Sequence, residues 1–212
     1  MDNILDKINA IGTLLSGIIA LIAYCTTIKY KKDVTRRNSS KANLNLALEF
    51  LKHSFETLTN NKENKLPKND RLIWLTCARQ IITAHNLSKN ITEDEDKKSY
   101  ETYREFWRVK FLELLREHKN KINLEYFSNK KEDLIFTQKN IVPNEILMEN
   151  EKESRNPISK DSLNVILAFI YSEENQYLSL DMKLSDKQII LIRFDFPIFY
   201  EYLEEYKKIY QN

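Results

Sequence analysis

The feature that most constrains this chain is an apolar run from Ile8 to Ile28 that contains no charged side chain. Its sequence, INAIGTLLSGIIALIAYCTTI, is 21 residues long. A helix of about 20 apolar residues spans the hydrocarbon core of a bilayer. The run therefore predicts a single transmembrane helix near the N-terminus.

The residues that follow the apolar run predict its orientation. The next segment, KYKKDVTRRNSSK, is strongly basic and contains a single acid, Asp33. Basic residues that flank a membrane helix favour the cytoplasmic side. We therefore expect a short N-terminus outside and the C-terminal domain in the cytoplasm, at a bacterial inner membrane. The basic residues assigned to topology and to lipid headgroups are Lys29, Lys31, Lys32, Arg36 and Arg37.

The apolar run has two other interpretations, a buried core helix and a cleaved signal peptide. A buried core helix is usually shorter and polar on one face. A cleaved signal peptide has basic residues before its apolar stretch and small residues at the cleavage site. Here the start, MDNILDK, is acidic, and Tyr24 to Lys29 makes a poor cleavage site. Both alternatives are less well supported than a membrane span.

Small residues recur within the apolar run at every fourth position, namely Gly12, Ser16 and Ala20. Such spacing lets two helix backbones approach closely in lipid. The pattern predicts helix–helix packing in the membrane and hence a homo-oligomer. The alternative is that these residues have no such role, because small residues are common in membrane helices.

The charge of the chain is concentrated beside the apolar run. Residues 1–41 hold seven of the 33 Lys and Arg residues and three of the 31 acids, which leaves 26 basic and 28 acidic residues, or −2, in the remainder. A domain that binds nucleic acid is usually basic by itself. Nucleic acid is therefore an unlikely partner, and the expected partners are the lipid bilayer and either a second copy or a cytoplasmic protein.

The composition gives little support for an enzyme or for a bound cofactor. The only glycines are Gly12 and Gly17, whereas phosphate-binding loops and nucleophile elbows need glycine. The three histidines are isolated, so no metal site is expected. Cys25 and Cys77 lie in apolar segments, which suits a reducing compartment.

Beyond the apolar run, the scarcity of glycine and the apolar periodicity predict an all-α fold. The expected units are the N-terminus and transmembrane helix (1–28), a basic juxtamembrane segment (29–41), a helical bundle (42–147), an exposed linker (148–158) and a C-terminal helical subdomain packed on the bundle (159–212). A helical seam from Leu44 to Leu58 begins the bundle. Since no Pro or Gly interrupts residues 29–60, the membrane helix continues into this seam in one interpretation.

Two further helices complete the predicted bundle. Residues 71–87, capped by Asp70, are apolar around most of the helix, which predicts a central position. Residues 93–119 follow a Thr92-x-x-Glu95 capping pattern. We expect Trp74 and Trp107 to meet in one core. We also expect a structural ion pair that joins the two helices, formed by Arg79 with Glu101 or Glu105.

The C-terminal part contains one ambiguous segment. After a helix at 161–174, residues 176–184 alternate apolar and polar, which is a strand pattern, and residues 188–194 are a candidate hairpin partner. Against a hairpin, Ser185 and Gln188 match a capping box. We therefore favour a short helix from Ser185 to Phe194, followed by a terminal helix that begins near Pro197 and carries several aromatic residues.

These features predict a membrane-anchored protein-interaction or effector module that is not an enzyme. The layout is common among small bacterial accessory and antiviral defence proteins, and in that setting the span would perturb the membrane. Two alternatives remain. One is a plain anchor or scaffold for a cytoplasmic partner. The other is a membrane-tethered enzyme with an unrecognised all-α site built on Arg79, His85, Glu101 or Glu105.

Overall fold

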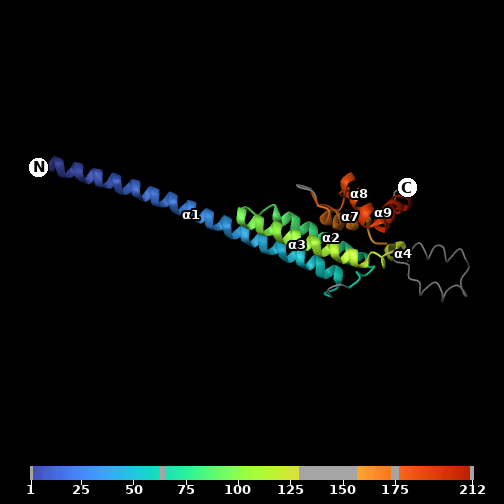
Figure 1. The fold of residues 1–212 in the computed structure, drawn as a ribbon. Coiled ribbons are helices and arrows are strands. Elements are labelled where there is room, and N and C mark those ends of the chain that lie inside the picture. Colours follow the sequence, from blue (N-terminus) through green and yellow to red (C-terminus); the bar gives the residue numbers. More distant parts are fainter. Residues whose placement is uncertain (1, 63–64, 129–156, 173–176, 211–212) are drawn as a thin grey trace, which may run out of the picture.

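The computed structural model describes residues 2–62, 65–128, 157–172 and 177–210, without the side chains of residues 2–14, 125, 128 and 206–210. All regular secondary structure in these residues is helical (Figure 1). The predicted all-α class is confirmed. The predicted linker at 148–158 falls almost entirely outside the described residues.

The first helix, α1, runs without a break from Asp2 to Thr59. At about 1.5 Å per residue its 58 residues extend over about 87 Å. Only its C-terminal half packs on other helices, and its N-terminal part projects from the bundle (Figure 1). The helix ends at Asn60 and Asn61, whose φ angles of 55° and 57° lie in the left-handed region that asparagine tolerates. The prediction that the N-terminal helix continues into the bundle is confirmed.

Helix α2 (Arg71–Ser88) is the central helix of the bundle, as predicted. It packs against α1 on one side and α7 on another (Figure 1). Trp74, Cys77 and Ile81 are fully buried in these contacts. The predicted cap is also confirmed, since Asp70 accepts a hydrogen bond of 2.8 Å from the backbone N–H of Leu72.

Helix α3 (Asp94–His118) packs against α1 and α7. Tyr100, Phe111 and Leu114 are buried, whereas Tyr103 is 52% exposed. The predicted Thr92 cap is wrong, because Glu93 and not Thr92 is the N-cap residue of α3, and the Glu93 side chain accepts no capping hydrogen bond.

The described residues that follow α3 form a smaller layer on α2 and α3. It comprises α4 (Leu124–Ser128), α7 (Lys160–Ile170), α8 (Asp186–Asp195) and α9 (Pro197–Tyr210). Every residue of α7 from Ser162 to Ile170 is buried, because α2 and α3 cover one side of α7 and α8 contacts it as well. The sequence predicted a longer helix here.

In the ambiguous segment, the residues from Asp186 onward form helix α8, and the described residues contain no β-strand. Ser185 accepts a hydrogen bond from the N–H of Gln188, and the Gln188 side chain accepts one from the N–H of Ser185. This reciprocal capping box begins α8, as predicted. In the preceding loop Leu178 is buried, and Leu180, Met182 and Leu184 pack against the core. The alternation of apolar and polar residues in the described part of this segment, residues 177–184, thus reflects a loop with one side on the core.

One hydrophobic core joins the bundle and the C-terminal helices. Trp74 and Trp107 both contribute to it, but their rings have different neighbours. Trp74 packs edge-on against Tyr126, with ring centres 6.4 Å apart. Trp107 packs against Phe55 at 5.6 Å. The prediction that both tryptophans share one core is confirmed, without a direct contact between their rings.

Among the described residues, no helix combines the length and the apolar composition needed to span a bilayer. Within the predicted span, residues 8–28, side chains are described only from Leu15 onward. Gly12 of the small-residue pattern lies outside the described side chains for the same reason.

Candidate functional site: the arm and its junction with the bundle

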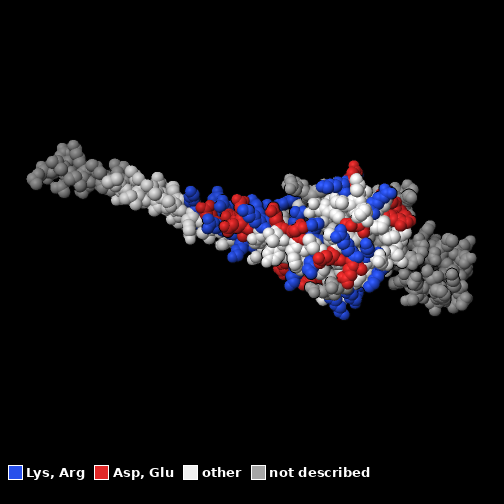
Figure 2. Space-filling view, viewed as in Figure 1, with Lys and Arg blue, Asp and Glu red and all other residues white. Residues whose placement is uncertain are grey.

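The most distinctive surface of the molecule is the projecting segment of α1 from Leu15 to Ser39, here called the arm. All side chains of the arm are exposed except that of Asp33, which is half-buried. Its first half is apolar and carries no Lys, Arg, Asp or Glu, as the white segment between the grey N-terminus and the coloured region in Figure 2 shows. The exposed apolar residues there include Leu15, Ile18, Ile19, Leu21 and Ile22, each between 52% and 65% exposed.

Large apolar side chains cover about half of this helix surface. At about 100° per residue, positions 15, 18, 19, 21 and 22 span about 160° of the circumference, and Ile28 extends this arc to about 180°. The remaining face carries Ser16, Ala20 and Ala23, and no charged residue lies on any side between Leu15 and Ile28. A helix without charged residues on any side is typical of segments that are buried in protein or in lipid. No part of the described chain covers this surface.

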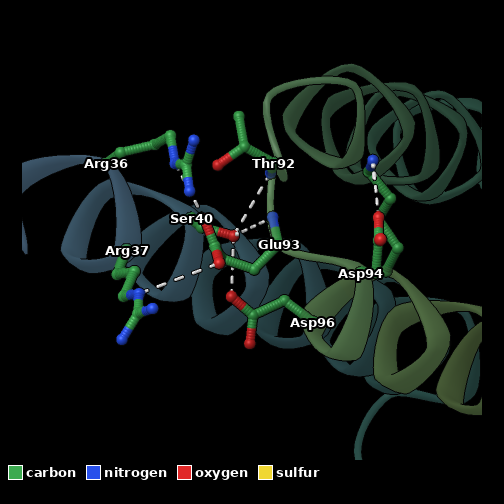
Figure 3. Close-up of polar contacts among 8 residues, drawn as sticks. Arg36, Arg37, Ser40, Thr92, Glu93, Asp94 and Asp96 are labelled. Carbon is green, nitrogen blue, oxygen red and sulfur yellow. Dashed lines mark hydrogen bonds and ion pairs between the residues drawn. The ribbon is translucent and has the colours of Figure 1, made fainter. Parts of the chain in front are cut away.

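The arm meets the bundle at Ser40, the first fully buried residue of α1. As Figure 3 shows, its hydroxyl oxygen accepts hydrogen bonds from the backbone N–H groups of Thr92 (3.2 Å) and Glu93 (3.1 Å). The same hydroxyl donates to Asp96 Oδ2 at 2.6 Å. A serine hydroxyl has one donor and two acceptor positions, so all three are used. Ser40 therefore fixes α1 to the loop between α2 and α3 and to the first turn of α3.

Charged side chains surround this contact. Arg36 Nε donates to Glu93 Oε1 at 3.0 Å, and Arg37 Nε lies 4.0 Å from Glu93 Oε2 (Figure 3). One turn further, Asn43 Nδ2 donates to the carbonyl oxygen of Asn90 at 3.3 Å. These residues and Ser40, together with the 90–96 segment, form what we call the junction.

The acidic side of the junction is the start of α3. Asp94, Glu95 and Asp96 occupy its first turn, where the helix dipole stabilises negative charge. They line a surface groove of about 510 Å³ together with Glu93, Arg37 and Lys41. The basic segment of α1 is thus placed against an acidic helix start that neutralises part of it.

The structure divides the predicted lipid-contacting cations into two groups. Lys29, Lys31 and Lys32 are exposed and form no ion pair within the described part of the chain. Arg36 and Arg37 instead turn toward Glu93. This second role of Arg36 and Arg37 was not predicted from the sequence. The available signal was the spacing of Ser40, which stands four residues before Leu44 and therefore lies on the packing face of α1.

The predicted ion pair between α2 and α3 is wrong. Arg79 is exposed, because it lies with Leu72 and Thr76 on a stripe of α2 that no described helix covers. Glu105 pairs instead with Arg108 on its own helix. Two nitrogens of Arg108 donate to Glu105, and the third, Nη1, donates to the carbonyl oxygen of Ile170 at 2.8 Å, at the end of α7. The hydrogen bond from Arg108 holds the pKa of Glu105 below its usual value.

A second polar cluster, not anticipated from the sequence, joins α3 to the C-terminal helices. Asp195 Oδ2 accepts hydrogen bonds from Arg116 (2.8 Å) and from the Tyr171 hydroxyl (2.5 Å). Burial opposes ionisation of Asp195, but these two donors outweigh it and lower its pKa. Burial and the bond to Asp195 both raise the pKa of Tyr171. Gln188 donates to the Tyr171 carbonyl oxygen at 3.0 Å and closes the cluster.

His85 is the one residue proposed for catalysis whose titration is strongly altered. Burial, with smaller contributions from Lys89 and Arg104, lowers its pKa from 6.5 to about 4. Its Nε2 atom is buried without a hydrogen-bond partner, and its ring packs on Tyr177 with centres 6.4 Å apart. No described contact brings His85 together with Arg79, Glu101 or Glu105. Within the described residues, no group of three or more metal-binding side chains converges.

The fold and the junction define an all-α protein with a projecting apolar arm. Compared with known proteins, the chain matches no family model, no curated protein and no solved structure.

Proposed function

We propose that this chain is a membrane-anchored interaction module of the bacterial inner membrane. In this proposal the apolar part of α1 lies in the bilayer, the N-terminus is outside and the bundle is in the cytoplasm. The observation that carries the proposal is the uncharged segment of the arm from Leu15 to Ile28, where exposed large apolar side chains cover about half of the helix surface. Exposed apolar patches of this kind mark contacts with membranes or with other proteins.

The length of the apolar run in the sequence supports this proposal. Residues 15–28 alone would extend about 21 Å as a helix, which is short of the hydrocarbon thickness of about 30 Å. The sequence run from Ile8 to Ile28 would extend about 31 Å. The helix α1 itself continues through this region from Asp2.

The junction gives the anchor a mechanical role. About 18 Å of continuous helix separates Ile28 from Ser40, and no glycine or proline interrupts it. Because Ser40 bonds to the α2–α3 loop and to α3, a rotation or tilt of the arm is transmitted to the bundle. We therefore propose that α1 couples the state of the membrane segment to the protein-binding surface of the bundle.

The small-residue face supports self-association of the arm. Ser16 and Ala20 are exposed on the helix face that lacks large apolar side chains, and a Cβ atom added at Gly17 would meet nothing within 4 Å. Such a face permits close packing of two helices in lipid. In the effector form of the proposal, binding of a cytoplasmic partner clusters the arms, and the clustered arms perturb the bilayer.

The anchor is tested by membrane retention after an alkaline carbonate wash of cells that express the full chain. The test variant carries Ile18→Lys and Ile22→Lys, and the matched control carries Val34→Lys, an exposed arm position beyond the apolar run. A central lysine costs about 3 kcal/mol of insertion free energy, so the double variant is expected in the wash and the control in the pellet. Equal retention of all three proteins would contradict the proposal.

The effector form and the plain anchor are separated by entry of a membrane-impermeant dye after induced expression. A truncation that begins at residue 29 retains Arg36 and Ser40 and therefore the whole junction. Dye entry with the full chain alone supports an effector. No entry with either chain assigns the arm to anchoring only. Replacement of Ser16 and Ala20 by Leu tests the clustering step, and full dye entry in that variant would exclude it.

A further inference from the structure

A cavity of about 420 Å³ lies between α7, α8 and α9, distant in sequence from the arm and the junction. Its volume is within the range of small-molecule sites in proteins. Four aliphatic side chains form its apolar lining, namely Leu184, Ile189, Ile192 and Leu203. The polar lining comes from Lys160, Asn164, Lys183, Tyr200 and Glu204.

Asn164 is the first sign that this cavity accepts a ligand. The residue is 5% exposed and lines the cavity from the middle of α7. Its side-chain amide forms no hydrogen bond within the described part of the chain, and it is the one polar side chain of α7 between Leu163 and Ile170. Buried amides in native proteins almost always have partners, so an unbonded one that faces a cavity is available to a bound molecule.

The charge of the lining indicates the kind of ligand. Lys183 is exposed at the cavity and forms no ion pair among the described residues. Lys160 and Glu204 each have polar partners of their own, and the lining as a whole carries two cations and one anion. A third cation is near, since the guanidinium of Arg193 lies 5.6 Å from the centre of the Tyr200 ring.

We propose that this cavity binds a small organic anion, in which an apolar body carries one carboxylate or phosphate group. The apolar body contacts Ile189, Ile192 and Leu203. The anionic group pairs with Lys183, and the amide of Asn164 donates to it or to a neighbouring polar atom. The site does not depend on the arm, so it holds whether or not α1 enters a membrane.

The elements around the cavity suggest a consequence of binding. The cavity is formed by the capping-box end of α8, the N-terminal half of α7 and the start of α9. A ligand that contacts all three helices stabilises their arrangement on α2, because it binds only the folded form. The cavity therefore gives the C-terminal helices a means to respond to a metabolite.

The test uses the full chain in nanodiscs of zwitterionic lipid and calorimetric titration with three probes of one shape. These are 2-naphthoate, the cationic 2-naphthylmethylammonium and the neutral 2-naphthylmethanol, each corrected with empty nanodiscs. The variants are Lys183→Gln and Asn164→Leu. The matched control is Lys187→Gln, which removes an exposed lysine of the same region that does not line the cavity.

We expect 2-naphthoate to bind more tightly than the other two probes. Lys183→Gln should weaken it by about tenfold, Asn164→Leu by a similar factor, and Lys187→Gln by less than about twofold. Because Lys183 is exposed, we expect Lys183→Gln to fold. This variant therefore tests the proposal even if Asn164→Leu does not fold. Equal affinity for the three probes, no binding of 2-naphthoate, or unchanged affinity in Lys183→Gln would each overturn the proposal.

Discussion

The two halves of α1 differ in how they distribute apolar side chains around the same helix. From Leu44 to Leu58 the apolar residues follow one seam, and Ala47, Leu51 and Leu58 are almost fully buried against the bundle. From Leu15 to Ile28 the large apolar residues cover about half of the circumference and are about half exposed or more, and no charged residue occupies the other side. A helix with an apolar seam and a charged opposite face is satisfied by one protein surface, whereas a helix without charge on any side is typical of a surrounding apolar phase.

The comparison also shows where the change occurs. The exposed lysines Lys29, Lys31 and Lys32 end the apolar half, and the buried Ser40 begins the packed half. Between them, Arg36 and Arg37 pair with Glu93. The junction is thus the boundary between an exposed apolar surface and a surface that packs on protein, on one uninterrupted helix.

The largest expected difference between the halves is in the stability of the bundle. Leu51 is fully buried and Leu21 is 64% exposed. We expect Leu51→Ala to lower the free energy of unfolding by about 2–5 kcal/mol, and Leu21→Ala by less than about 0.5 kcal/mol. Urea unfolding followed by tryptophan fluorescence measures this, since Trp74 and Trp107 both report on the bundle. A comparable loss in the two variants would mean that the arm packs on protein.

A smaller effect is expected at the junction. Ser40→Ala leaves the N–H groups of Thr92 and Glu93 without their acceptor and Asp96 without a donor, so we expect a loss of about 1–3 kcal/mol. Ser39→Ala is the matched control, because Ser39 is exposed and adjacent. Amide hydrogen exchange of residues 90–96 should rise in the Ser40 variant alone. Unchanged exchange there would show that Ser40 does not hold the junction.

The next effect concerns pH and lies within the bundle. The pKa of His85 falls from 6.5 to about 4 on folding, so the unfolded chain takes up a proton first as the pH falls. The stability present above pH 6.5 is therefore lost progressively toward pH 4. We expect a loss of about 1 kcal/mol between pH 7 and pH 5, allowing for partial exposure of the ring.

Substitution of His85 by Gln removes this contribution. Unfolding of the full chain in urea at pH 7 and at pH 5 should then show a smaller difference than in the natural sequence. His53→Gln is the control, since the His53 side chain is 49% exposed on α1. An equal pH dependence in the natural chain and in His85→Gln would show that His85 does not cause it.

The smallest effect is expected for the ion pair of the junction. The side chains of Arg36 and Glu93 are 55% and 26% exposed, and such surface pairs contribute between about 0.2 and 1 kcal/mol. We expect Arg36→Gln to destabilise the bundle within that range at low salt and to have no effect at about 1 M salt. Lys32→Gln should have no effect at either salt concentration. A salt-independent loss in Arg36→Gln would indicate a packing role for its aliphatic stem.

Much of the fold could be predicted because local signals agreed with tertiary packing. Three local patterns correctly predicted structure, namely the seam from Leu44 to Leu58, the Asp70 cap of α2 and the capping box of α8. The strand pattern of residues 176–184 was a weaker signal. Alternating burial also arises in a loop whose one side lies on the core, as Leu178 does here.

The candidate site was less predictable because it depends on contacts between residues distant in sequence. Ser40 and Glu93 are 53 positions apart, and nothing local to either indicates their hydrogen bond. Arg79 was misplaced because the many apolar residues of α2 suggested burial on every side, whereas Leu72, Thr76 and Arg79 form an exposed stripe. The cavity lined by Asn164 could not be predicted, because it forms between three helices whose relative positions do not follow from local sequence patterns.

The most direct test of the membrane arm is a spin-label accessibility scan of residues 15–39 in the full chain reconstituted in vesicles. Single cysteines are introduced in a Cys25→Ser background, and Cys77 is fully buried. We predict high accessibility to oxygen from Leu15 to Ile28, and a change to high accessibility to a polar nickel reagent from Lys29 to Lys32. Uniformly high accessibility to the polar reagent along the whole arm would contradict its insertion in lipid.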